Sequence, residues 1–117
     1  APFVNPDTEP RLRKLRAQVF SSLSHTWTVE EMAAAVDLSP SRFHAVYRAA
    51  YGTTPTSDLI NARINAAKEL LISSSKSITE ISESLGYGNL THFMRQFRSF
   101  TGTSPKKYRD SARSGII

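Results

Sequence analysis

The sequence contains two copies of one pattern about 50 residues apart, and this internal repeat limits the fold more than any other feature. The segment TVEEMAAAVDL (28–38) returns as SITEISESLGY (77–87), and FHAVYRAAYGTTP (43–55) returns as FMRQFRSFTGTSP (93–105). In each copy, a short segment with a helix-capping start precedes a turn and a second segment with helical apolar spacing. A short helix, a turn and a second helix form a helix-turn-helix unit, so the repeat predicts two such lobes in one chain.

The residues outside the two copies also have helical spacing. Apolar side chains recur every three or four positions from Leu12 to Leu23, and a longer run extends from Pro55 to about Ser73. No useful length of the chain alternates apolar and polar residues, as a half-buried strand would. We therefore predict an all-α fold of about seven helices, with two helix-turn-helix subdomains joined by a long central linker helix. The expected segments are a lead-in (1–10), the first lobe (11–54), the linker helix (55–73), the second lobe (74–113) and a tail (114–117).

Small polar residues and glycines mark where the predicted helices begin and end. A Ser or Thr hydroxyl at a helix start accepts a hydrogen bond from a backbone amide, and a Glu three residues later can bond back to it. Gly52 is predicted to end the helix before it, and Gly86 is placed to take the positive φ that ends the first helix of the second copy. The candidate caps are Asp7 or Thr8, Thr28, Ser39, Ser77, and Asn89 or Thr91.

The charge balance of the chain favours a polyanionic partner. Fifteen Lys and Arg against ten Asp and Glu give a formal net charge of +5 and a pI near 9.9. Such a charge suits nucleic acid or an acidic membrane surface. The chain has no cysteine, which excludes a disulfide framework, and it has no apolar run of about 18 residues that would cross a membrane.

Residue patterns for catalysis or metal binding are missing from the sequence. The three histidines, His25, His44 and His92, have no helical i, i+4 pairing, and no thiol is present to complete a metal site. No GxSxG motif occurs, and acidic residues are spread over the helix starts, where they suit the helix dipole. We therefore predict that the protein is not an enzyme and uses no metal or cofactor.

The second helix of each copy carries polar and basic residues opposite its apolar face. In the second copy, Phe93, Phe97 and Phe100 lie at i, i+4 and i+7, which predicts that their rings face the core. In a helix-turn-helix, the exposed face of the second helix meets the edges of the DNA bases. Arg can form two hydrogen bonds with guanine O6 and N7, whereas Ser, Thr and His bind base edges less selectively. The candidate base-reading residues are Ser41, Arg42, His44, Ala45, Arg48, Leu90, Thr91, His92 and Arg95.

A second group of residues is predicted to contact DNA phosphates. Basic side chains near the end of the chain and backbone amides at two helix starts are suited to phosphate oxygens. The candidates are Arg98, Lys106, Lys107 and Arg109, with the helix starts at Thr28 and Ser77.

The second copy resembles the DNA-binding domain of the AraC/XylS family of transcription regulators. The resemblance rests on GY after the first helix, FMRQFR, GTSP and KKYR, and it extends over about residues 11–113. It implies two helix-turn-helix lobes joined by a linker helix similar to 55–73, with both recognition helices in successive major grooves of duplex DNA. The first copy departs from the family pattern at Ala45, where relatives often carry a longer polar side chain. Ser82 and the Ile60–Asn61 pair also depart from it, at positions that bear on packing.

The resemblance also implies a cellular setting. It implies a bacterial activator in the cytoplasm, associated with the nucleoid, with operator DNA as partner and RNA polymerase as a contact. Because the chain begins with Ala, we expect it to be the C-terminal part of a longer regulator with a ligand-sensing or dimerisation domain. Regulators that consist of this domain alone also exist, so the length is compatible with both arrangements.

Three other interpretations of the basic residues stay open at this stage. A helical adaptor would use the same face to bind an acidic protein, and then charge would matter but helix-end chemistry would not. A single-stranded nucleic-acid binder would need exposed aromatic rings for stacking, whereas these rings are spaced for burial. A charged segment can also be only a solvated surface.

Overall fold

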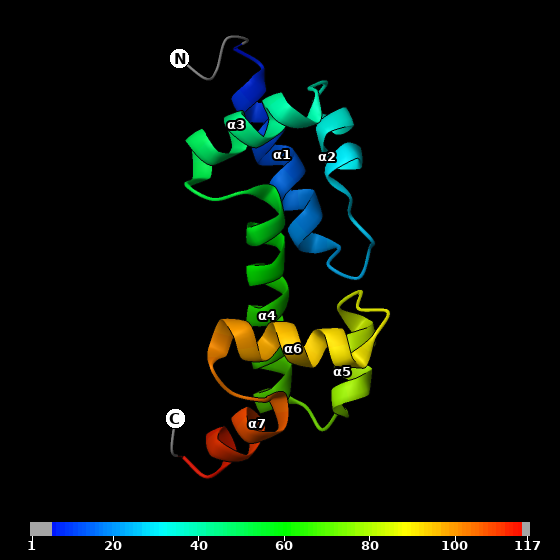
Figure 1. The fold of residues 1–117 in the computed structure, drawn as a ribbon, viewed down its shortest axis with the longest axis vertical. Coiled ribbons are helices and arrows are strands. Elements are labelled where there is room, and N and C mark those ends of the chain that lie inside the picture. Colours follow the sequence, from blue (N-terminus) through cyan, green and yellow to red (C-terminus); the bar gives the residue numbers. More distant parts are fainter. Residues whose placement is uncertain (1–5, 116–117) are drawn as a thin grey trace. The chain divides into compact units, whose positions relative to one another are not determined.

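The computed structural model describes residues 6–115, and these form helices joined by short turns, with no strand among them. The prediction of an all-α fold of about seven helices is confirmed. In Figure 1 the colours follow the helices from blue at α1 to red at α7. The helices are α1 (Thr8–Ser21), α2 (Val29–Ala35), α3 (Pro40–Tyr51), α4 (Pro55–Ser73), α5 (Ile78–Ser84), α6 (Leu90–Thr101) and α7 (Pro105–Arg113).

The chain divides into two units, and the division falls inside α4. The first unit contains α1, α2, α3 and the start of α4 up to Ile60. The second contains α4 from Asn61 onward, α5, α6 and α7, together with residues 23–25 of the loop that follows α1. Each unit therefore has one complete helix-turn-helix, α2–α3 in the first and α5–α6 in the second.

The helix starts are fixed by the caps that the sequence predicts. The side chains of Thr28, Ser39, Ser77 and Asn89 each accept a hydrogen bond from the backbone amide three residues later. At Ser77 the bond is returned, because the Glu80 carboxylate accepts from the Ser77 amide at 3.0 Å. This backbone bond lowers the pKa of Glu80. Asp7 precedes α1 but its side chain makes no capping bond, because its backbone is already helical and not extended.

The core of the first unit combines apolar packing with one buried polar network. The Asp58 carboxylate accepts a hydrogen bond from Arg16 Nε at 2.8 Å and another from the Tyr47 hydroxyl. Burial, and then the bond to Asp58, raise the pKa of Tyr47, so its hydroxyl keeps its proton and acts as the donor. The network joins α1, α3 and α4 around the apolar side chains. The buried apolar residues of this unit are Leu12, Leu15, Val19, Met32, Ala33, Val36, Phe43, Val46, Tyr47 and Leu59.

The core of the second unit is built around the rings of α6. Phe93 and Phe97 are fully buried, and Tyr108 of α7 meets Phe97 edge to face at 5.6 Å between ring centroids. The prediction that Phe100 faces the core is wrong, because its side chain is 45% exposed. Phe100 lies in the last turn of α6, just before Gly102 turns the chain. Periodicity gives the direction of a side chain, but not how far the neighbouring helices extend along it. The other buried apolar residues of this unit are Ile64, Ala67, Leu71, Ile81, Leu85 and Tyr87.

The turn after α5 depends on Gly86 for two reasons. Its φ is +84°, as predicted from the sequence, and a Cβ there would lie 2.9 Å from the carbonyl oxygens of both Leu23 and Ser24. Arg63 of α4 holds the same loop, donating from Nε to Leu23 O at 3.1 Å and from Nη2 to His25 O at 2.8 Å. Residues 23–25 are thus bound to the second unit by close backbone approach and by one guanidinium.

We expect Gly86→Ala to destabilise the protein more than Gly102→Ala. Both glycines have a positive φ, so each substitution incurs backbone strain of about 1 kcal/mol. A Cβ at Gly102 has no atom within 4 Å, whereas one at Gly86 collides with two backbone oxygens. Urea unfolding of both variants measures the difference, and equal losses would contradict the close approach at Gly86.

Two phenylalanines of α6 provide a second matched pair. Phe93→Ala should lower the free energy of unfolding by about 3–5 kcal/mol, because it removes a fully buried ring. Phe100→Ala should change it by less than about 1 kcal/mol, because that side chain is already half exposed. Thermal unfolding followed by circular dichroism gives both values. A stable Phe93→Ala variant would show that the core of the second unit is wrongly assigned.

Candidate nucleic-acid interface

Each helix-turn-helix buries one face of its second helix and exposes the other. Phe43 and Tyr47 of α3 are buried, as are Phe93 and Phe97 at the matching positions of α6. On a helix, positions three and four residues apart share a face, so the remaining face of each is continuous. The exposed residues on it are Ser41, Ala45, Arg48 and Ala49 in α3, and Thr91, Arg95, Arg98 and Ser99 in α6.

Two predicted base-reading residues of α3 lie at the edges of its exposed face. Arg42 and His44 are half-buried. His44 Nδ1 is 3.2 Å from the Pro40 carbonyl oxygen. A carbonyl oxygen only accepts, so Nδ1 must carry the proton, and the neutral ring has Nε2 left as an acceptor. His44 is thus suited to an amino group on a base edge.

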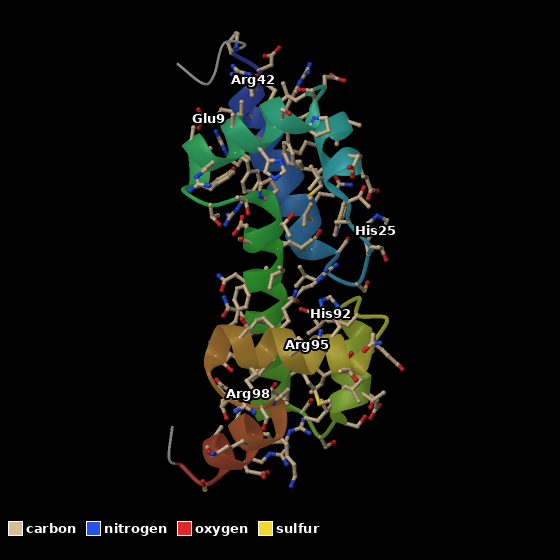
Figure 2. The ribbon with its side chains drawn as sticks, in the orientation of Figure 1. Glu9, His25, Arg42, His92, Arg95 and Arg98 are labelled. Carbon is tan, nitrogen blue, oxygen red and sulfur yellow. The ribbon has the colours of Figure 1, made fainter. Side chains whose placement is uncertain are left out.

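His92 of α6 has the opposite polarity. Burial raises the pKa of Tyr87, so its hydroxyl stays protonated and donates to Gln96 Oε1. The Gln96 amide nitrogen then faces His92 Nε2 at 3.4 Å as a donor, which makes Nε2 an acceptor and leaves the proton on Nδ1. The free nitrogen of this ring is therefore a donor. Figure 2 labels His92, Arg95 and Arg98 along α6. Leu90, at the start of the helix, is half-buried.

The arginines separate into those that hold the fold and those that do not. Six donate hydrogen bonds within their own unit, and Arg42 also has an interaction within the protein. Arg48, Arg95 and Arg98 make no hydrogen bond, ion pair or ring contact with any described residue, and all three are exposed. They all lie on α3 or α6. Unpaired guanidinium groups are the strongest available donors for guanine edges and phosphates.

The residues predicted to contact phosphate differ in whether their side chains are already hydrogen-bonded within the protein. Lys106 and Lys107 are exposed at the start of α7, and Arg98 is exposed on α6. Arg109 is half-buried, and it donates to Leu71 O at 2.9 Å and to Ser74 O at 3.3 Å. Its guanidinium thus satisfies carbonyls at the C-terminal end of α4, which have no partner within the helix. The spacing of KKYR contains no signal for this role, because α7 and the end of α4 are about 35 residues apart in the chain.

Thr28 and Ser77 are both exposed, and their hydroxyls are engaged in capping. The Thr28 hydroxyl accepts from the Glu31 amide at 3.1 Å, and the Ser77 hydroxyl accepts from the Glu80 amide at 3.0 Å. One of the free amides at each of these helix starts is therefore already satisfied by the chain itself.

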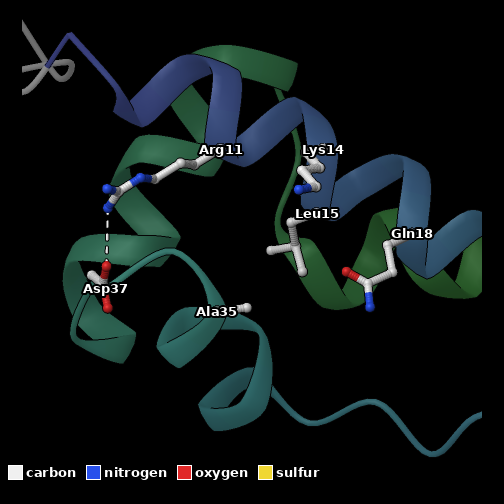
Figure 3. Close-up of a pocket in the computed structure, with 6 residues that line it drawn as sticks. All are labelled: Arg11, Lys14, Leu15, Gln18, Ala35 and Asp37. Carbon is white, nitrogen blue, oxygen red and sulfur yellow. Dashed lines mark hydrogen bonds and ion pairs between the residues drawn. The ribbon is translucent and has the colours of Figure 1, made fainter.

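The first unit also contains a pocket of about 390 Å³, and none of the residues predicted to read bases lines it (Figure 3). An ion pair of 2.9 Å joins Arg11 and Asp37 at its edge. The pocket lies between α1 and the end of α2 and includes no residue of α3. Its lining residues are Arg11, Lys14, Leu15, Gln18, Ala35 and Asp37.

Residues 6–115 contain neither a metal-binding cluster nor a membrane-spanning helix. No three His, Cys, Asp or Glu side chains gather there in a way that could hold a metal ion. None of the helices in that range is both long and apolar enough to cross a membrane.

Comparisons with known proteins agree with this geometry. A family model described as a helix-turn-helix domain matches residues 32–111. The RCS-specific HTH-type transcriptional activator RclR of Escherichia coli is 31% identical over 104 residues, 89% of this chain and 37% of that protein. The transcriptional activator NphR of a Rhodococcus species is 38% identical over 89 residues, 75% of this chain and 26% of that protein. The chain thus spans roughly a third of the length of these curated relatives.

A solved structure connects the fold to DNA. The DNA-binding domain of AdpA, described as the global transcriptional factor, was crystallised in complex with a target DNA. It aligns with a TM-score of 0.86 and 29% identity, covering 89% of this chain and 94% of that one.

The role of Arg109 can be separated from that of its neighbour Lys106. Arg109→Ala should lower the free energy of unfolding by about 1–3 kcal/mol, because the Leu71 carbonyl loses its side-chain donor and the Ser74 carbonyl keeps only Arg113. Lys106→Ala should change it by less than about 0.5 kcal/mol, because that side chain is exposed and has no partner among the described residues. Urea unfolding of both variants provides the comparison. Equal stability of the two variants would return Arg109 to the candidates for phosphate binding.

Proposed function

The chain belongs to the AraC-type family of helix-turn-helix DNA-binding domains, and on that premise we propose that it reads a specific duplex sequence with α3 and α6. Its family makes it a DNA-binding domain of a transcription regulator and not an enzyme. The proposal adds the mode of recognition: each second helix lies in a major groove, and the two grooves are successive. The observation that supports it is that Arg48, Arg95 and Arg98, which have no partner among the described residues, all lie on these two helices.

The chemistry of the two exposed faces fits base edges. Arg95 can donate two hydrogen bonds to O6 and N7 of guanine, and the Thr91 hydroxyl can donate or accept. His44 offers an acceptor and His92 a donor, so the two rings suit different base edges. Ser41, Arg42, Ala45, Arg48 and Leu90 complete the proposed set of base contacts.

Phosphate contacts supply sequence-independent affinity in the proposed complex. Lys106 and Lys107 are exposed at the start of α7, and Arg98 is exposed near the end of α6. Neutralising phosphates releases counterions, so binding should weaken steeply as salt rises. We place the backbone amides at the helix starts near Thr28 and Ser77 in the same group. Arg109 is not included, because its guanidinium already donates to a carbonyl at the end of α4.

The length of α4 supports the proposal of two successive grooves. A helix of 19 residues is about 28 Å long, and one turn of duplex DNA is about 34 Å. Residues of this one helix belong to both units. A single chain can therefore carry two readers to an asymmetric site without forming a dimer.

The wider setting is also proposed from the relatives. RclR and NphR are named as transcriptional activators. By analogy we propose that this domain acts in a regulator that contacts RNA polymerase, in the cytoplasm and on the nucleoid. A ligand-sensing or dimerisation domain elsewhere in the full-length protein is part of the same proposal.

Selection from a random duplex library at about 150 mM salt tests the proposed function directly. Two short motifs with centres about 10 base pairs apart are expected. Retention without a motif would mean that the basic surface binds phosphate only. No retention would favour the alternative of an adaptor for an acidic protein.

Arg95→Ala and Lys106→Ala should weaken binding in different ways. Arg95→Ala should weaken the selected site by about 1–3 kcal/mol and relax the preference at one base pair, because a base contact is lost. Lys106→Ala should weaken all sequences alike and lower the slope of affinity against salt by about 1. Fluorescence anisotropy with the selected duplex and a scrambled duplex measures both effects. If the two variants behaved alike, the division between base and phosphate contacts would be incorrect.

A further inference from the structure

We propose that the two units discriminate bases unequally, with Arg95 of the second unit as the main guanine reader and α3 of the first unit contributing chiefly sequence-tolerant affinity. This inference rests on the proposed function, because it divides base reading between the two helices. It concerns which residue decides the sequence of the site.

The internal repeat makes the two exposed faces directly comparable. At an offset of 50 residues, Arg48 of α3 matches Arg98 of α6, and Ala45 matches Arg95. The members of each pair are exposed in their own units. The arginine near the end of the helix is thus common to both units, and the arginine near the middle is present in the second alone.

The difference lies at the centre of the reading face. Arg95 is one turn beyond Thr91 and makes no hydrogen bond, ion pair or ring contact with any described residue, so its fork of donors is free to bond guanine O6 and N7. Ala45 has only a methyl group, which cannot donate or accept a hydrogen bond. Its possible contact is with a thymine methyl, which discriminates less than a bidentate pair. One turn later the same contrast appears in weaker form, because Ala49 matches Ser99.

The remaining polar groups of α3 lie beside this face and not at its centre. His44 is half-buried and its Nδ1 faces the Pro40 carbonyl, which leaves one nitrogen for a ligand. Arg42 is half-buried as well and has an interaction within the protein. Arg48 is the unpaired arginine of α3, and it matches Arg98, which we assign to phosphate. Arg48 stands in the proposed set of base contacts, and the present inference moves it to the phosphate role of Arg98. The group that both units share therefore supplies affinity, and the group that differs supplies discrimination.

The test uses the intact chain and the duplex obtained by selection. Each base pair of the two half-sites is changed in turn, and each guanine is replaced by 7-deazaguanine, which lacks the N7 acceptor but keeps Watson–Crick pairing. Anisotropy titrations are made with the unaltered protein, Arg95→Ala, Arg98→Ala and the mirror variant Ala45→Arg. All three substitutions are at exposed positions, and circular dichroism verifies that each variant is folded.

We expect base changes to weaken binding strongly in the half-site read by α6 (the costly half-site) and only slightly in the half-site contacted by α3 (the mild half-site). In the costly half, one 7-deazaguanine should weaken binding by about 5-fold or more in the unaltered protein and in Arg98→Ala, but not in Arg95→Ala. Ala45→Arg should create a new guanine preference in the mild half-site, because it gives α3 the group that α6 already has.

Other results would overturn the inference while leaving the proposed function intact. Equal penalties in both half-sites would do so, as would a 7-deazaguanine penalty that persists in Arg95→Ala or disappears in Arg98→Ala. A large penalty for uracil in place of thymine in the mild half-site would show that α3 discriminates through methyl contacts. Absence of any selected motif in the unaltered protein would overturn the proposed function itself.

Discussion

The burial of aromatic rings on one face of each second helix is the constraint on which the rest of the structure depends. Phe43 and Tyr47 hold α3, and Phe93 and Phe97 hold α6. A helix fixed along one face has only its opposite face left for a ligand, so packing decides which side chains face the proposed DNA ligand. In the proposed complex the aromatic residues act in recognition without touching DNA, because they set the rotation of the helix that carries the arginines.

The two units meet this constraint with different chemistry. In the first, the Tyr47 ring ends in a hydroxyl that is satisfied by Asp58, which Arg16 also binds. In the second, Phe97 has no hydroxyl, and its ring packs against those of Phe93 and Tyr108. A buried polar network requires every hydrogen-bond partner, whereas packed rings require only a complementary shape, so the first unit should tolerate fewer substitutions at its centre. The two copies thus share the same order of helices, but different interactions stabilise their cores.

The structure, and not the composition, shows which arginines are bonded within the fold and which are available to a ligand. Five of the ten arginines donate hydrogen bonds that join one segment to another, such as Arg63 on the loop of residues 23–25 and Arg109 on the end of α4. The net charge alone indicated a polyanionic partner, but it did not show where that partner binds. The few arginines without a partner among the described residues point to α3 and α6, and this is a far more specific signal than the total of +5.

The sequence by itself determined the helices, their caps at Thr28, Ser39, Ser77 and Asn89, and the positive φ of Gly86, because these depend on contacts within a few residues. It also determined the two repeated units and the exposed faces of α3 and α6, because helical period places side chains on faces. Only the tertiary structure decided that Phe100 is exposed, that Arg109 of α7 donates to the carbonyls at the end of α4, and that Gly86 lies against the loop after α1. Each of these depends on segments far apart in the chain, and no local pattern specifies which distant group fills the space beside a side chain.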